Sequence, residues 1–264
     1  IEVEFSILVD AFSKMESTTK RLELTQYLVE LFEKTPRDVI SRIVYLLQGK
    51  LRPDFEGVEL GVAEKLAIRA IAKSAGSDSV EKKIEEEYRK SGDLGHAASK
   101  ILEQKEQTTF LIQDITVERV YENLLTIAKL EGSKTQDRKI KYISGLLNDA
   151  NSVEAKFILK ILLGTLRLGI AENTVMDALA ITFTGNKENR KVLEHAYNVS
   201  SDLGRVAETI AIHGLKGIEE FKIDLFNPIR PMLADRVKSE EEAIEKLGNN
   251  FAAEYKLDGE RVQI

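Results

Sequence analysis

Several residues near the end of the sequence are of types that do chemistry. Lys256 lies two residues before an Asp258-Gly259 step, and apolar and polar residues alternate on both sides of it. Alternation around an Asp-Gly step is typical of a β-hairpin with a tight turn. A lysine at the point where a strand enters such a turn has a fixed backbone, so its amine is aimed, and the deprotonated amine is a nucleophile. The alternative is a surface lysine without a chemical role.

A second set of residues has the types and spacing that hold phosphate. Two Gly-x-Leu-Arg segments end in Arg52 and Arg167, and each is followed by a Leu-Gly-(Val/Ile) segment, with Gly61 in the first and Gly169 in the second. Glycine allows close backbone approach, the free amides of a helix N-terminus favour phosphate, and arginine adds a two-pronged donor. The alternative is that the glycines end helices and the arginines lie over the core. Because the block occurs twice, both interpretations stay open.

Further polar positions are less specific. Thr19 and Arg21 belong to a polar and basic cluster that predicts a helix start with phosphate contacts, or a solvated first turn. Lys139 and Lys141 are ambiguous in the same way. The sequence has no cysteine and three widely separated histidines, which excludes thiolate chemistry and predicts no metal site.

The sequence pattern predicts that helices position these residues, from residue 1 to about residue 220. Leu24, Leu28 and Leu31 recur at helical spacing, and strand-like alternation is scarce before residue 250. Short Gly/Ser/Asp breaks separate the helical segments, so the sequence predicts an all-α domain over residues 1–222.

The helical domain contains an internal duplication. Residues 46–52 match residues 161–167, and the segment that ends at Gly95 matches the one that ends at Gly204. Ordered matches at a nearly constant offset predict two copies, about 1–102 and 117–212, which we expect to pack about a pseudo-twofold axis. Asp93 and Asp202 then cap the helices that follow them.

The chain changes character after residue 222. Two of its four prolines, Pro228 and Pro231, predict an extended connector over residues 223–236. A short helix with a serine cap and acidic first turn follows from Ser239 to about Gly248. We expect residues 237–264 to be the truncated start of a second domain, with a strand over 251–256.

The order of these features is similar to that of a known family. Pro-x-Arg-Pro-Met-Leu-Ala (228–234), an acidic helix and Glu-Tyr-Lys-Leu-Asp-Gly-Glu-Arg (254–261) follow one another as in archaeal and eukaryotic-type ATP-dependent DNA ligases. The resemblance spans nearly the whole chain. It implies a duplicated helical DNA-binding domain followed by the first short helix and β-hairpin of an α+β nucleotidyltransferase domain.

The resemblance also implies a reaction. Lys256 resembles the lysine that becomes adenylated, Glu254 the glutamate that contacts adenine, and Arg261 the arginine at the nucleotide ribose or phosphate. The implied activity is the sealing of nicks in double-stranded DNA through a lysine-AMP intermediate, with ATP and Mg²⁺. No later motif of that domain follows Arg261, so we expect this chain to bind nicked duplex without ligating it.

A partner motif lies between the two copies. Gln107, Phe110 and Leu111 resemble the short peptide by which archaeal replication proteins dock on the sliding clamp, although that peptide prefers two aromatic residues. The alternative is a loop whose Phe110 and Ile112 fill the core.

Composition limits the function further. The net charge is −6, so DNA contacts must come from local clusters rather than bulk charge. No apolar run is long enough to cross a membrane, and a cytoplasmic location follows by default. The absence of cysteine and the heavy use of Glu and Lys fit a thermophile. The sequence leaves two alternatives to a DNA ligase open: a helical scaffold that binds proteins, and a nucleotidyltransferase that acts on RNA.

Overall fold

Helices make up most of the chain. The computed structural model describes residues 2–106, 114–132, 134–231, 235–255 and 259. These ranges contain no strand, and an isolated bridge pairs Glu4 with Thr116. The α-helices are α1 (Phe5–Glu16), α2 (Arg21–Lys34), α3 (Ile40–Leu47), α4 (Glu64–Ser74), α5 (Glu81–Ser91), α6 (Leu94–Glu106), α7 (Val117–Lys129), α8 (Thr135–Asp149), α9 (Ser152–Leu162), α10 (Glu172–Thr184), α11 (Arg190–Ser200), α12 (Leu203–Glu219) and α13 (Glu240–Leu247). The 3-10 helices are η1 (Asp54–Glu56), η2 (Asp78–Val80) and η3 (Lys187–Asn189). The predicted all-α domain is confirmed.

Side-chain caps set several helix starts. Asp202 accepts the backbone amide of Arg205 at 2.9 Å, and Asp93 accepts that of His96 at 3.0 Å. Asn151 forms a capping box at the start of α9. These bonds satisfy amides that have no partner inside the helix. The N-caps predicted at Asp93 and Asp202 are therefore confirmed.

The helix order repeats. Helices α1–α6 recur as α7–α12, and the 3-10 helices η2 and η3 precede α5 and α11 in the same way. The buried faces agree as well, since Leu28 and Leu31 of α2 occupy the positions of Ile143 and Leu146 in α8. Both copies are thus built from one helical unit.

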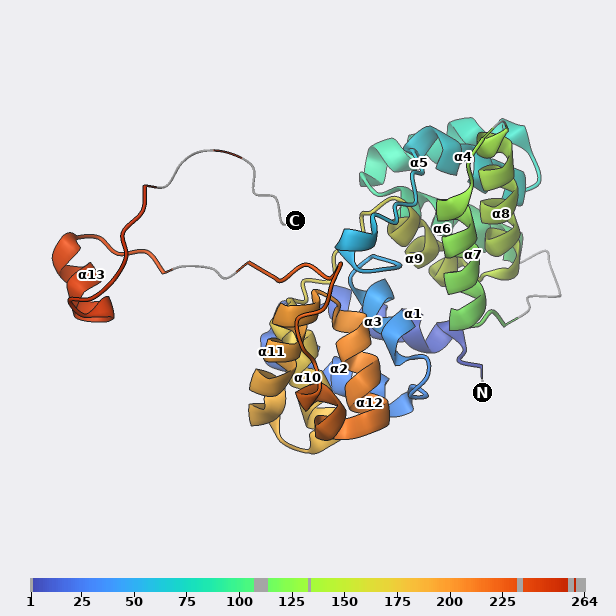
Figure 1. The fold of residues 1–264 in the computed structure, drawn as a ribbon. Coiled ribbons are helices and arrows are strands. Elements are labelled where there is room, and N and C mark those ends of the chain that lie inside the picture. Colours follow the sequence, from blue (N-terminus) through green and yellow to red (C-terminus); the bar gives the residue numbers. More distant parts are fainter. Residues whose placement is uncertain (1, 107–113, 133, 232–234, 256–258, 260–264) are drawn as a thin grey trace.

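The two copies are interwoven rather than merely adjacent (Figure 1). Helix α3 packs on α12, and its counterpart α9 packs on α6. In the same way α2 packs on α10 while α8 packs on α4. A single apolar core runs through both copies. Such an exchange of partners is what a pseudo-twofold relation would give; the axis itself stays a prediction.

Equivalent polar bonds join the copies at these crossings. The Tyr45 hydroxyl of α3 donates to Asp202 at 2.7 Å, and Lys160, at the matching position of α9, lies 3.0 Å from Asp93. Burial and the nearby Asp202 carboxylate raise the pKa of Tyr45. Burial alone would raise the pKa of Asp93, but the hydrogen bond from Lys160 holds it below its ordinary value. Each capping aspartate is therefore also a bond between copies.

Glycines allow the helices to approach at the same crossings. A Cβ on Gly204 would lie 2.3 Å from the Tyr45 ring, and one on Gly95 would lie 2.7 Å from the carbonyl oxygen of Lys156. Neither distance is possible for real atoms. The matched glycines of the repeat are therefore needed for the close contact of α12 with α3 and of α6 with α9.

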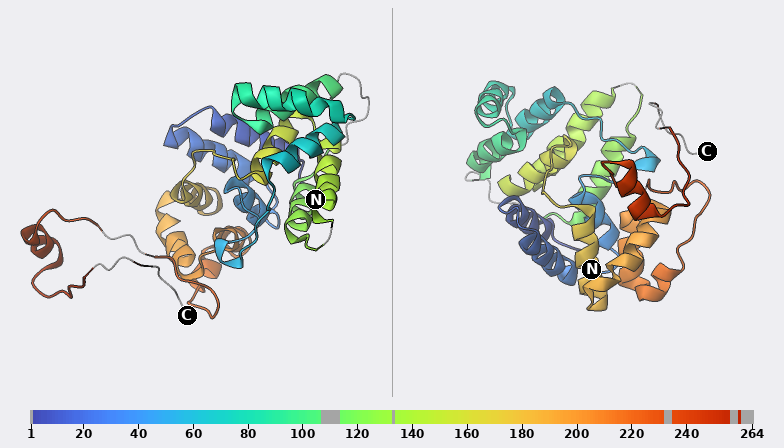
Figure 2. Two further views of the ribbon diagram at one scale, coloured as in Figure 1. Left: turned by 90° about the horizontal axis from the view of Figure 1, so that it is seen from above. Right: turned by 90° about the vertical axis from the view of Figure 1, so that its left-hand side faces the viewer.

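The chain leaves the helical body after α12. Residues 227–231 have no regular structure, and α13 begins at the predicted Ser239 cap and ends before Gly248. Helix α13 buries none of its residues and stands apart from the helical body in two views (Figures 1 and 2). Residues 251–255 form no strand. Residues 256–258 and 260–264 lie outside the described part, so the predicted hairpin is not confirmed.

Candidate functional site

The two Gly-x-Leu-Arg segments are loops that leave α3 and α9. Gly49 and Gly164 follow the helix ends with φ of 67° and 65°. Around each, two backbone amides donate back into the helix. In the first copy Lys50 donates to Tyr45 and Gly49 to Leu46, and in the second Thr165 donates to Lys160 and Gly164 to Ile161. This is the Schellman motif, in which glycine adopts the left-handed conformation at low cost. The interpretation of these two glycines as helix ends is therefore correct.

The arginines of these loops reach solvent. Arg52 and Arg167 are both exposed, while Leu51 and Leu168 beside them are buried. The buried leucines hold the loop backbone in place, so the backbone beside each arginine is fixed while its guanidinium reaches solvent. The Nε of Arg52 lies 3.9 Å from a carboxylate oxygen of Glu56, whereas Arg167 forms no ion pair with the residues the structure describes.

The two loops lie next to each other. A Cβ on Gly49 of the first loop would be 3.8 Å from the Cβ of Leu166 in the second. The repeat thus brings its two copies of the candidate motif together at one place, although Gly49 and Leu166 are far apart in sequence.

A second pair of glycines precedes α4 and α10. Gly61 and Gly169 are exposed and have φ of 55° and 68°. The residues at the helix N-caps are Ala63 and Ala171, and neither helix start has a side-chain cap. Alanine is a poor N-cap, so the first amides of both helices remain available to an anion or to water.

The glutamates that open these helices are turned to other partners. Glu64 accepts a hydrogen bond from Tyr88 at 2.6 Å, and Glu172 accepts one from Tyr197 at 2.6 Å. Burial, and then the bond to Glu172, raises the pKa of Tyr197. The carboxylate of the first helical residue is thus held by a tyrosine in both copies.

In the second copy, the same glutamate also holds the connector. Arg230 lies 2.7 Å from Glu172, and its guanidinium carbon lies 4.1 Å from the centre of the Tyr197 ring. The Arg230 amide donates to the Asn198 carbonyl at 2.8 Å. The sequence indicated only an extended segment here. The structure shows that Arg230 attaches this segment to Glu172, in the first turn of α10. We call this contact the connector anchor. Helix α10 directly follows the second loop.

The cluster at the start of α2 is partly engaged in packing. The guanidinium of Arg21 lies 2.8 Å from Asp177, a fully buried residue of α10. Lys187 and Arg190 lie 3.4 Å and 3.3 Å from the same carboxylate. Arg21 therefore joins the two copies, and Thr19 beside it is exposed. Their predicted contacts with DNA stay predictions.

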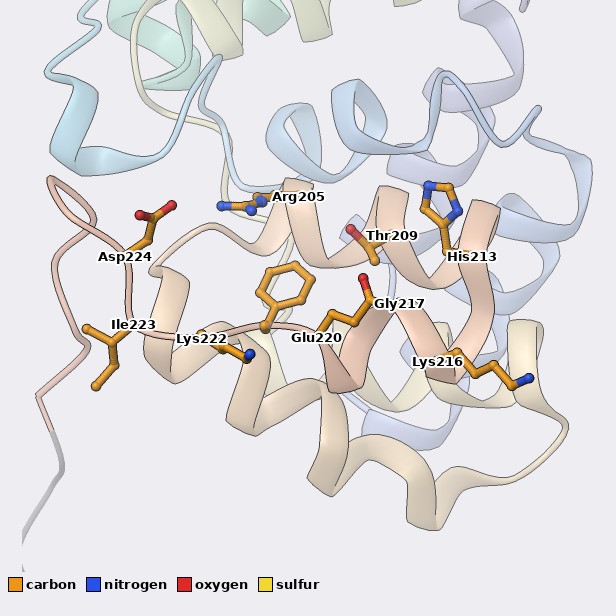
Figure 3. Close-up of a pocket in the computed structure, with 10 residues that line it drawn as sticks. Arg205, Thr209, His213, Lys216, Gly217, Glu220, Lys222, Ile223 and Asp224 are labelled. Carbon is orange, nitrogen blue, oxygen red and sulfur yellow. The ribbon is translucent and has the colours of Figure 1, made fainter.

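A hollow of about 720 Å³ lies beside α12, away from the predicted residues (Figure 3). Gly214, with φ of 64°, breaks the helix, and a Cβ on Gly217 would lie 2.6 Å from that of His213. Gly217 lines the hollow, and its lack of a side chain permits this close approach to His213.

The charges around this hollow are mixed. Arg205, Lys216 and Lys222 line it together with Glu220 and Asp224. The Arg205 guanidinium lies 5.1 Å from the centre of the Phe221 ring. With cations and carboxylates nearly balanced, the hollow has less attraction for phosphate than the two loops.

Most of the other predicted residues lie outside the described part of the chain. These are Lys256 and Arg261 of the nucleotide motif and Gln107, Phe110 and Leu111 of the clamp motif. Glu254 is described and exposed. In the residues that the structure describes, no group of three or more His, Asp or Glu could hold a metal ion. None of the helices in that part of the chain has the length and apolar character of a membrane span.

Comparisons with known proteins cover both parts of the chain. Residues 4–180 match the family model described as DNA ligase N terminus, and residues 231–264 match the one described as ATP dependent DNA ligase domain. The chain is 80% identical over 262 residues to the DNA ligase of Nitrosopumilus maritimus and 64% identical over 262 residues to that of Cenarchaeum symbiosum. It is 46% identical over 269 residues to DNA ligase 2 of Thermofilum pendens. Each match covers 99% of this chain and 44% of the relative.

Proposed function

The chain belongs to the ATP-dependent DNA ligase family, and from this premise we propose that its helical domain holds nicked duplex DNA for sealing. The contact surface is the pair of adjacent loops with Arg52 and Gly61 in the first copy and Arg167 and Gly169 in the second. Phosphates on either side of a central point of the duplex are the ligands.

The observation that carries this proposal is the recurrence of one phosphate-binding arrangement in both copies. Each copy presents an exposed arginine on a fixed loop, a left-handed glycine and an uncapped helix start. Duplex DNA has local twofold symmetry, so two copies about a pseudo-twofold can meet equivalent phosphates on its two strands. What supports the proposal is the combination of the three features at one place in each copy.

The charge of the chain agrees with contacts of this local kind. At a net charge of −6, bulk attraction to DNA is absent. Binding must then come from a small number of phosphate contacts, each of which releases counterions. A modest but measurable salt dependence follows.

We assign the reaction chemistry to the segment that matches the ligase domain. The Lys256 amine, once deprotonated, attacks the α-phosphate of ATP, so that a P–N bond forms and pyrophosphate leaves. AMP then passes to the 5′-phosphate at the nick, and the 3′-hydroxyl displaces it. Glu254 contacts adenine and Arg261 the ribose or phosphate. Mg²⁺ supplies neutralisation of phosphate charge.

The chain spans 44% of the length of the curated relatives, so its own behaviour is a separate proposal. We expect these 264 residues to bind nicked duplex without ligating it. Docking of Gln107, Phe110 and Leu111 on the sliding clamp belongs to the same proposal. The family match favours this reading over a protein-binding scaffold or an RNA-directed nucleotidyltransferase.

Fluorescence anisotropy of labelled nicked, intact and RNA-containing duplexes across a salt series tests the proposal. We expect nicked or intact DNA to bind with an affinity that falls as salt rises, and Arg167→Ala to weaken binding. Arg89→Ala, an exposed arginine of α5, is the matched control and should leave affinity unchanged. Absence of binding at low salt, or an equal loss in both variants, would contradict the proposal.

A further inference from the structure

Lys139 of α8 is a buried lysine. The residue is 8% exposed, and its Nζ donates to the carbonyl oxygens of Leu60 at 2.7 Å and Gly61 at 3.2 Å. An ammonium group has three donors, and the third has no partner among the residues the structure describes. Lys139 also forms no ion pair within that part of the chain. It is a cation held beneath the first glycine loop without a counter-charge.

Packing does not require a charge at this position. The duplication supplies the comparison, because Leu24 of α2 occupies the matching position and is 3% exposed. A buried ammonium group costs free energy unless it is paired. Leu24 shows that the helical unit accepts an apolar residue at this helix position. The charge therefore needs an explanation other than packing.

The Nζ lies directly beneath Gly61. A Cβ placed on this exposed glycine would lie 3.3 Å from the Lys139 Nζ, so any other residue would place its side chain against the ammonium group. Because glycine has no side chain there, a phosphate oxygen can approach the loop backbone closely on the side beneath which the ammonium group lies.

Other donors converge on the same place. Helix α4 begins two residues after Val62, and its N-cap Ala63 leaves the first amides without a side-chain acceptor. A phosphate oxygen at Gly61 would meet the ammonium group together with the positive end of a helix. The second copy offers the helix start at Gly169 without a lysine beneath it.

We propose that Lys139 contacts a DNA backbone phosphate at Gly61. The proposal rests on the proposed function, since it places a further phosphate contact on the same surface. It makes the two loops unequal, because the first adds a buried cation to Arg52 and the second has only the exposed Arg167. The ligand class is the phosphate diester of duplex DNA.

Lys139→Met tests the contact, because methionine fills the same volume without charge. We expect affinity for a nicked duplex to fall roughly fivefold to tenfold and the slope of log K against log salt to shrink by about one. Lys83→Met, at an exposed lysine of α5, is the control and should change neither quantity. Denaturant unfolding of each variant checks that the fold is intact.

The outcomes separate the two proposals. If the unaltered chain does not bind DNA, the proposed function fails and this contact fails with it. If the chain binds and Lys139→Met leaves the salt slope unchanged, Lys139 does not contact phosphate, and this inference alone is overturned, even where affinity falls. Should the variant not fold, NMR of the unaltered chain decides: duplex must shift the Lys139 Nζ signal, and an unchanged signal would overturn the contact.

Discussion

The two glycine loops share a backbone and differ in charge. In both copies a Schellman motif ends the preceding helix and a left-handed glycine precedes an uncapped one. In the first copy Arg52 lies near Glu56, and Lys139 lies beneath the loop. In the second copy Arg167 has no ion pair in the described part, and Leu24 takes the place of the lysine.

The comparison shows that the two copies share the backbone geometry of the loops and differ in the charged side chains around them. The backbone geometry is retained in both copies. If the proposed contacts form, the second loop would meet phosphate with its own Arg167, and the first loop would add Lys139 of a neighbouring helix to its Arg52. The second copy has also gained the connector anchor, in which Glu172 of α10 holds Arg230.

The largest expected effect concerns the crossings that hold the copies together. Gly204→Ala places a methyl group into the Tyr45 ring, so we expect the free energy of unfolding to fall by roughly 3 kcal/mol. Tyr45→Ala should recover part of this loss by removing the ring. Denaturant unfolding of the single and double variants measures both effects. An unchanged midpoint for Gly204→Ala would mean that α12 does not approach α3 as closely as described.

A smaller effect separates the two arginines. Arg167→Ala should weaken binding to nicked duplex by roughly tenfold, while Arg52→Ala should weaken it only about threefold, because Glu56 already offsets part of the Arg52 charge. Anisotropy at one salt concentration compares them. Glu56→Gln should raise affinity slightly in the chain with Arg52 and not in the Arg52→Ala background. Equal losses for the two arginines would contradict the described asymmetry.

The connector anchor gives a third comparison. Glu172→Gln should weaken the hold on Arg230, so we expect hydrogen exchange at the Arg230 amide to accelerate about fivefold. Glu64→Gln, the matching change in the first copy, should leave that amide unchanged. Exchange measured by mass spectrometry on peptides covering residues 227–231 tests this. Equal acceleration in both variants would show a general loss of structure instead.

The smallest effect is in the pH dependence of two bonds between the copies: the Tyr45–Asp202 bond, and the pairs that Glu16 of α1 forms with Lys156 at 2.7 Å and Lys160 at 2.6 Å in α9. Burial would raise the pKa of Glu16, but hydrogen bonds from Lys156 and Lys160 lower it below 4.5. Its contribution to stability is present above that value and is lost as the pH falls through the lowered pKa. Glu16→Gln should therefore flatten the loss of stability on the acid side. Tyr45→Phe should leave the acid-side loss of stability unchanged.

At alkaline pH the Tyr45 variant, rather than the Glu16 variant, should change the pH dependence of stability. The pKa of Tyr45 is raised above 10.0, so its contribution is present below pH 10 and is lost as the pH rises further. Tyr45→Phe should flatten this loss in part, although Lys160 also has a raised pKa and contributes there. Denaturant midpoints measured from about pH 3 to pH 11 test both sides. An acid-side change in Tyr45→Phe would contradict the assignment.

Much of the fold could be predicted from local signals. The spacing of apolar residues predicted the helices. Asp93, Asp202 and Ser239 predicted helix starts because their side chains can accept hydrogen bonds from the first free amides of a helix. The repeat was visible because glycines and arginines recur in order. The partner exchange between copies was not predictable, since a duplication fixes equivalence and says nothing about whether a helix packs within its own copy or across.

The candidate site was only partly predictable for the same reason. Arg52, Arg167, Gly61 and Gly169 stood out by their own types and spacing. Lys139 was only an ambiguous candidate beside Lys141, because its burial and its bonds to the carbonyl groups of a loop distant in sequence cannot be predicted from its neighbours. Arg21 showed the reverse case, where an exposed-looking basic cluster is partly used to pair with a buried aspartate.

The most direct test of the central claim is phosphate ethylation interference on a nicked duplex. Two equivalent loops predict two groups of interfering phosphates, placed symmetrically about a central point on opposite strands. Arg167→Ala should remove most of one group, and Lys139→Met should weaken the other. A single group of phosphates, or two groups that respond alike to both variants, would contradict the account.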